Sequence, residues 1–199
     1  DYGEKDQHVP TYSLLIAVSI FCVIFIYLFD VFGTLGEGVT SLNSRFISEE
    51  ILLIFRSACA LLAIYTIFVL MIFDKEGGNM NPLFHIERIT KNHKPMGLER
   101  MVPFSSWTLI VFGLYFLSVS LLGWFELLGY DLSKFILNSS AVLLPMSLGM
   151  SMLTATVVTY IIIPDEVSSD RDYNHLFKTH EMVMHNWTVI LISLDAILS

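Results

Sequence analysis

Basic residues are scarce in this 199-residue sequence, which has 11 Lys and Arg against 19 Asp and Glu and a formal net charge of −8. A protein that binds nucleic acid needs a basic face for the phosphates, so we predict no nucleic-acid partner. Charged residues make up 15% of the chain, whereas an average soluble domain has roughly 25%. The sequence also lacks internal repeats and low-complexity tracts, which argues against a repeat architecture.

Cysteine is nearly absent, because only Cys22 and Cys59 are present and both fall within apolar stretches. We interpret them as small packing residues rather than as a disulfide, so they give no indication of the redox compartment. No pattern of His, Cys, Asp and Glu requires a metal ion, and the sequence predicts no cofactor.

Long apolar runs are abundant: hydrophobic residues make up 54% of the chain and the mean hydropathy is +0.65. A helix needs about 20 mostly apolar residues to cross a bilayer, since each residue adds about 1.5 Å. Five runs approach or reach this length, at 12–29, 51–73, 104–125, 135–163 and from 182 onward. We therefore predict an all-α, polytopic transmembrane helical bundle of about five helices, forming a single domain over 1–199.

Two prolines and the end of the chain refine this prediction. We expect Pro145 to kink the fourth helix and Pro164 to end it, because proline lacks a backbone donor. Only 15 residues run from His185 to Ser199, too few to cross the hydrocarbon core. We therefore expect the chain to continue into a sixth helix.

The distribution of Lys and Arg predicts the topology. The N-terminus and the loops 74–103 and 165–181 fall on one side and contain Lys5, Lys75, Arg88, Lys91, Lys94, Arg100, Arg171 and Lys178. The opposite side has Arg45, Lys134 and, marginally, Arg56. We expect the more basic side to face the cytosol or an equivalent compartment.

Polar residues stand at the beginnings of two predicted helices. Ser105 and Ser106 open the third helix, and each is explained by helix N-capping. His185 opens the fifth helix and is explained by an interfacial position beside Trp187. Both helices start from the same side, however, so a hydroxyl and an imidazole fall at similar depth. The pair Ser105 and His185 is therefore a candidate nucleophile and general base.

Two charged residues lie within predicted spans. Asp195 comes ten residues after His185, about 15 Å deeper along a helix. Arg56 is the only basic residue inside a predicted span. An unpaired charge in hydrocarbon costs several kcal/mol, so we predict an intramembrane ion pair between Arg56 and Asp195. This pair is either purely structural or the floor of a polar cavity that tunes His185.

Three segments resemble the androgen-induced/FAR-17a and rolling-stone-like multi-span membrane proteins. The segments are LLIFRSACALLAIY in the second helix, FSSWTLIVFGLYF in the third and MHNWTVILISLD in the fifth. The last one matches the family pattern of a His followed ten residues later by an acid. The resemblance covers a helical core over 50–199 and leaves 12–29 as an extra N-terminal helix.

The resemblance implies a function, because members of the animal branch are lipid hydrolases with an intramembrane Thr nucleophile and a His partner. By position the Thr falls on Ser105, which keeps the hydroxyl, and the His falls on His185. Ser106, Asn186 and Thr188 are candidates for oxyanion or site support. The resemblance implies an intramembrane serine/threonine-type hydrolase of lipid or fatty-acyl esters in an endomembrane or the plasma membrane, with membrane lipids as partners.

A second interpretation stays open, namely a non-catalytic accessory or scaffold subunit of a larger membrane complex in an organelle inner membrane. Other subunits would then be its partners. In a pigment or haem complex, His85, His180 or His185 would be candidate ligands. A transporter is a third and weaker interpretation.

Overall fold

The computed structural model describes Ile16, Ile20 and residues 46–75, 83–84, 89–90, 93–130, 134–168 and 174–198. The chain divides into two compact units, Asp1–Val39 and Thr40–Ser199, and the elements below belong to the second. Ile16 and Ile20 are helical, but the rest of the helix predicted over 12–29 lies outside the described residues. Arg45, His85 and Lys91, on which other predictions rest, also lie outside them.

The described part of the second unit is almost entirely helical. The first span is α3 (Glu49–Tyr65) with the π-helical segment η2 (Thr66–Ile72), and the second is α4 (Phe104–Leu127). The third joins α5 (Lys134–Val157), the π-helical η4 (Val158–Ile162) and α6 (Ile163–Ser168). The fourth joins α7 (Thr179–Met182), the π-helical η6 (Val183–Trp187) and α8 (Thr188–Leu198).

Short elements connect these spans. Two 3-10 turns, η3 (Gly97–Met101) and η5 (Asn174–Phe177), precede the second and fourth spans. A two-residue antiparallel pair, β1 (Leu83–Phe84) with β2 (Ile89–Thr90), lies in the loop after the first span. This pair does not change the fold class, and the predicted all-α bundle is confirmed.

Four described helices are long and apolar enough to cross a membrane: Glu49–Ile72, Phe104–Leu127, Ile136–Ser168 and Thr179–Leu198. They correspond to the second to fifth helices that the apolar runs predict. The chain is therefore a multi-span integral membrane protein. The third of these spans has 33 residues, more than a perpendicular helix needs, and a tilted helix accommodates such an excess.

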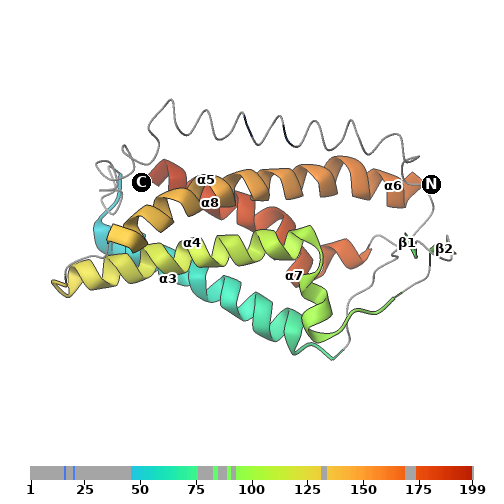
Figure 1. Cartoon of the computed structure of the whole chain (residues 1–199), viewed down its shortest axis with the longest axis horizontal. Helices are drawn as coiled ribbons and strands as arrows, with labels where there is room; N and C mark the ends of the chain where they lie inside the picture. The colour runs from blue at the N-terminus through green and yellow to red at the C-terminus, as the bar shows by residue number, and fades with distance from the viewer. Residues whose placement is uncertain are drawn as a thin grey trace. The chain divides into compact units, whose positions relative to one another are not determined.

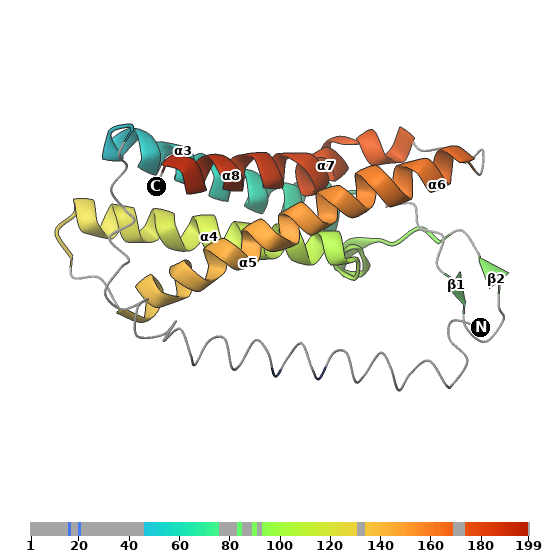
Figure 2. The same ribbon diagram turned by 90° about the horizontal axis from the view of Figure 1, so that it is seen from above.

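Successive spans run in opposite directions, as Figure 1 shows. α4 packs against α3 on one side and α5 on the other, and α8 closes the bundle by contacting α5 and α3. Figure 2 shows α5 crossing α4 obliquely. One end of the bundle, at the right of Figure 1, thus collects the end of η2 and the beginnings of α4 and α7. We call this the polar end for the residues described below.

The core of the bundle combines aromatic and very small residues. Leu109, Phe112 and Phe116 of α4 are fully buried, and they fill the space between the spans. A Cβ atom at Gly113 would lie 3.1 Å from the Cβ atom of Ala63 on α3. Such small pairs allow two membrane helices to approach closely, which is where most of their packing energy arises.

The third and fourth spans correct two predictions. Pro164 does not end its helix, since α6 continues to Ser168. The π-helical η4 directly precedes α6, in which Pro164 is the second residue, and local π-helical adjustments let a membrane helix tolerate the donor that a proline removes. Pro145 lies inside α5, which continues past it to Val157. The last span begins at Thr179 rather than Met182, which extends it to 20 residues.

Candidate functional site

The predicted pair of Arg56 and Asp195 is present in the structure. Arg56 Nε donates to Asp195 Oδ1 at 2.7 Å, and Nη2 donates to Oδ2 at 3.3 Å. The hydroxyl group of Tyr115 also donates to Asp195 Oδ2. Arg56 is 2% exposed and Asp195 is fully buried. The carboxylate therefore joins α3, α4 and α8, and each charge has a partner of opposite sign.

Arg56 also lines a cavity of about 270 Å³ at the other end of the bundle from the polar end. Glu49, Glu50 and Glu126 line the same cavity, together with leucines of α3 and α4. A cavity with these polar walls is roomy enough to hold water. Hydration from this side lowers the cost of keeping a guanidinium charged inside the bundle.

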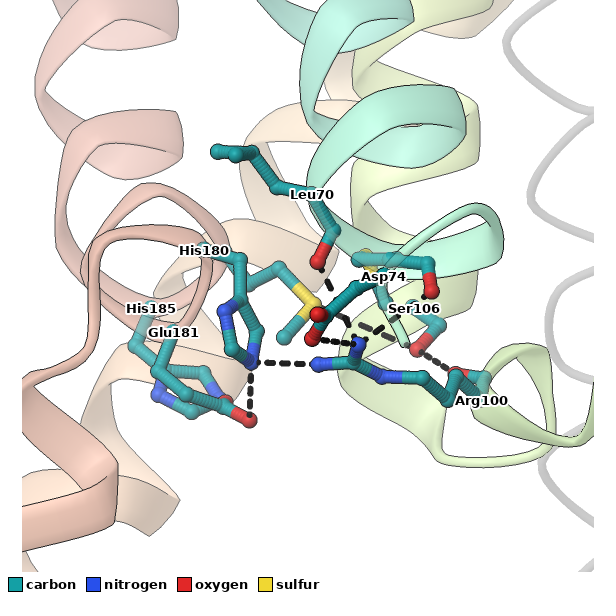
Figure 3. Close-up of polar contacts among 9 residues, drawn as sticks. Leu70, Asp74, Arg100, Ser106, His180, Glu181 and His185 are labelled. Carbon is teal, nitrogen blue, oxygen red and sulfur yellow. Dashed lines mark hydrogen bonds and ion pairs between the residues drawn. The ribbon is translucent and has the colours of Figure 1, made fainter. Parts of the chain in front are cut away.

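At the polar end, Arg100 connects three elements, as Figure 3 shows. Its Nη1 donates to Asp74 Oδ2 at 2.8 Å and to the Leu70 and Met71 carbonyls at 3.3 and 3.2 Å. Its Nη2 lies 2.7 Å from His180 Nε2. A guanidinium only donates, so His180 Nε2 is the acceptor. Arg100 thereby ties the end of η2 and the start of α4 to α7, and it places a cation on carbonyls at a helix end.

Glu181 lies between two buried histidines of the last span. Its Oε1 is 3.3 Å from His180 Nε2, and its Oε2 is 3.4 Å from His185 Nε2. Glu181 and His185 are four residues apart, so one helix face brings them together. His185 is 5% exposed. A carboxylate at one ring nitrogen fixes the tautomer of an imidazole and leaves the other nitrogen as the proton acceptor.

The two serines at the start of α4 differ in their surroundings. Ser106 is 1% exposed; its hydroxyl donates to the Arg100 carbonyl at 2.7 Å and lies 3.9 Å from Met184 Sδ. Ser105 is half-buried. Within the described part of the chain its hydroxyl makes no hydrogen bond, so it is not hydrogen-bonded to His185, and the close approach of these two side chains stays a prediction. Pro103 occupies the N-cap position, so the N-capping interpretation of the serines is wrong.

Of the three predicted supporting residues, Asn186 and Thr188 bond within their own span, whereas Ser106 bonds to the Arg100 carbonyl. Thr188 Oγ1 donates to the Met184 carbonyl at 2.9 Å, which commits its hydroxyl hydrogen. Asn186 Nδ2 lies 3.3 Å from Met182 Sδ. The structure therefore pairs Arg56 with Asp195 and places Ser106 near Met184, the residue before His185. It shows no hydrogen bond between Ser105 and His185.

Three of the four described spans carry a π-helical segment, and all three segments lie toward the polar end. One of them, η6, contains His185. π-helical turns are rare and occur often at functional sites, where they redirect side chains. Two of these segments, η2 and η6, adjoin Arg100, Glu181 and His185, which makes this end of the bundle the candidate functional site.

The sequence interpretation did not place Asp74 or Glu181 in a candidate site; it gave Arg100 only as a loop charge and His180 only as a candidate pigment or haem ligand. Glu181 was readable from its i,i+4 spacing to His185, but only for a helix that begins before Met182. Arg100 had no such signal, because its side-chain partners come from two segments far from it in the sequence, 70–74 and His180. Among the described residues, no group of three or more His, Cys, Asp and Glu side chains is arranged to hold a metal ion.

Comparisons of this chain with protein-family models, with curated proteins and with solved structures find no match. The resemblance to the androgen-induced/FAR-17a and rolling-stone-like proteins therefore stays a prediction. The function has to be argued from the polar end itself.

Proposed function

We propose that this multi-span membrane protein hydrolyses an ester bond of a membrane lipid or fatty-acyl ester, with His185 as the general base. The observation that carries the proposal is the pairing of His185 Nε2 with Glu181 Oε2 at 3.4 Å, inside a π-helical turn of a membrane span. A buried imidazole oriented by a carboxylate is suited to accept a proton from a hydroxyl nucleophile.

The nucleophile in this proposal is Ser105, which the family resemblance also supports. Its hydroxyl oxygen attacks the ester carbonyl carbon while its proton passes to His185. The tetrahedral intermediate then collapses, the acyl–oxygen bond breaks, and the leaving alcohol takes that proton. Water, deprotonated by the same imidazole, then attacks the acyl-serine; the acyl–Oγ bond breaks, Ser105 takes the proton back from His185, and the fatty acid is released.

The proposal requires Ser105 and His185 to approach each other when the ester binds. Catalytic hydrogen bonds are often long or misaligned before substrate binds and tighten in the complex. The neighbouring Ser106 supports this arrangement, because its bond to the Arg100 carbonyl fixes the first turn of α4. Ser106 is the alternative nucleophile, and variants distinguish the two.

The test is labelling of the purified full chain by a fluorophosphonate, together with hydrolysis of fatty-acyl esters. We expect Ser105→Ala and His185→Asn to abolish both signals, and Ser105→Thr to retain them in part. Ser118→Ala is the matched control, since Ser118 lies on the same helix and its hydroxyl bonds only to the Tyr115 carbonyl. If Ser106→Ala loses both labelling and hydrolysis while Ser105→Ala retains them, Ser106 is the nucleophile instead of Ser105.

A wild-type chain that neither reacts with the label nor hydrolyses any ester would refute the hydrolase proposal. If that chain also purifies within a stable larger assembly, the accessory-subunit interpretation becomes the better one. Glu181→Gln separates a positioning role from a structural one. It should lower hydrolysis and change its pH profile while the thermal stability stays near that of the wild type.

A further inference from the structure

A pocket of about 400 Å³ lies at the polar end of the bundle, beside the Arg100 cluster. Val69, Leu70 and Asp74 line it from the end of the first span. Phe177, Lys178, Thr179 and His180 line it from the start of the last span. Its volume falls in the range of about 300–1,000 Å³ that small-molecule sites occupy.

The pocket lining has an apolar part and a polar part. Val69 and Leu70 belong to a membrane span, and Phe177 is exposed beside them. The remaining lining residues are polar or charged: Asp74 follows the first span, and Lys178, Thr179 and His180 lie at the start of the last span. This order matches an amphiphile whose carbon chain lies on the membrane side and whose head group lies at the surface.

The charges of the lining favour an anionic head group. Asp74 already accepts from Arg100 at 2.8 Å, which neutralises its charge locally. His180 turns its acceptor nitrogen toward the same guanidinium at 2.7 Å. Lys178 is exposed and makes no ion pair within the described part of the chain. The ammonium group of Lys178 is therefore the charge that the pocket offers to a ligand.

We propose that this pocket binds the phosphate group of a phospholipid. Lys178 supplies the ammonium and Thr179 the hydroxyl that donate to phosphate oxygens, while Val69, Leu70 and Phe177 contact the glycerol and first acyl carbons. A lysine binds phosphate as a compact point charge. If the chain is a hydrolase as proposed, this pocket identifies phospholipid esters as its substrate class, so the substrate assignment rests on the proposed function. Binding of the phospholipid does not itself require hydrolysis.

The experiment measures binding to the purified full chain in detergent by native mass spectrometry, with three probes. The probes are a short-chain phosphatidylglycerol, a diacylglycerol of the same chain length and inorganic phosphate. We expect the phospholipid to bind about tenfold or more tightly than the diacylglycerol, as one charge-assisted hydrogen bond allows. Equal binding of the two lipids would refute phosphate recognition. Inorganic phosphate binding as tightly as the phospholipid would refute the lipid assignment.

Two charge reversals localise the site. Lys178→Glu should remove the preference for the phospholipid, whereas Lys94→Glu, at an exposed lysine preceding the second span, should retain it. An equal loss of the phospholipid preference in both variants would mean that the preference comes from overall surface charge, and it would refute binding at this pocket. Lys178→Gln serves if the reversal prevents folding, and it should also lose the preference. His185→Asn should keep binding and lose hydrolysis, so failure of the pocket and failure of the hydrolase are distinguishable.

Discussion

Replacing Asp195 by Asn tests whether the buried ion pair holds three spans together. The change keeps the size of the side chain and removes its negative charge, so it isolates the electrostatic contribution. Asp195 accepts from Arg56 at 2.7 and 3.3 Å and from Tyr115. After the change, the Arg56 guanidinium, 2% exposed, would face a neutral amide between α3 and α8.

The expected loss follows from that burial. Breaking a buried pair by removing one partner costs about 3–5 kcal/mol, because the remaining charge is desolvated and uncompensated. The cavity of about 270 Å³ beside Arg56 is large enough to hold water, and such hydration of the guanidinium favours the lower end of that range. Tyr115→Phe removes one hydrogen bond to a charged group and keeps the ion pair, so it should cost about 1.5–3 kcal/mol.

The assay is the free energy of unfolding in mixed micelles, measured for Asp195→Asn, Arg56→Gln and the double variant. Each single change leaves one buried charge alone, whereas the double change leaves none. We expect the double variant to be more stable than the sum of the single losses predicts, with a coupling energy of about 2–3 kcal/mol. Additive losses would show that the two charges do not stabilise each other, and the reasoning would then be wrong.

Three further substitutions test the packing and the polar end. Gly113→Ala should be less stable than Gly149→Ala by about 1–3 kcal/mol in a thermal unfolding assay. The reason is that a Cβ atom at Gly113 would lie 3.1 Å from α3, whereas a Cβ atom at Gly149 meets nothing within 4 Å. Equal stabilities would contradict the close packing of α3 and α4. Arg100→Lys should lower the free energy of unfolding by about 1.5–3 kcal/mol and speed proteolysis of the 74–103 loop, because one ammonium group cannot make all the hydrogen bonds of the planar guanidinium. The control Lys94→Arg should change neither quantity. Thr154→Val removes the buried hydrogen bond between the hydroxyl groups of Thr154 and Thr108, whose oxygens are 2.8 Å apart. It should lower the free energy of unfolding by about 0.6 kcal/mol, a typical value for a hydrogen bond between membrane helices. An unchanged free energy would mean that this hydrogen bond makes no net contribution to stability.

The sequence alone predicted the existence of the four spans that the structure describes. Apolar runs such as 104–125 are long enough to cross a bilayer, and a membrane helix must satisfy all its backbone groups internally. The ion pair was predictable for a similar reason, because hydrocarbon makes an unpaired charge expensive. Arg56 and Asp195 were the available partners of opposite sign within the predicted spans.

Boundaries and facing directions were decided by the tertiary structure. Thr179, His180 and Glu181 look like a polar loop in the sequence, yet they begin the last span. Arg100 Nη2 donates to His180 Nε2, and Glu181 Oε2 lies 3.4 Å from His185 Nε2, so two of these three side chains have partners within the bundle. The start of α7 could not be located without knowing where Arg100 lies.

The choice between Ser105 and Ser106 shows the same limit. Successive residues of a helix point about 100° apart, so a shift of one residue separates a half-buried hydroxyl from a buried one. Which of them faces His185 depends on the rotation of α4 about its axis. Packing against α3 and α5 sets that rotation, through contacts such as Gly113 with Ala63. The residue types of the polar end are readable in the sequence, but the contacts among them exist only because the ends of three spans meet there.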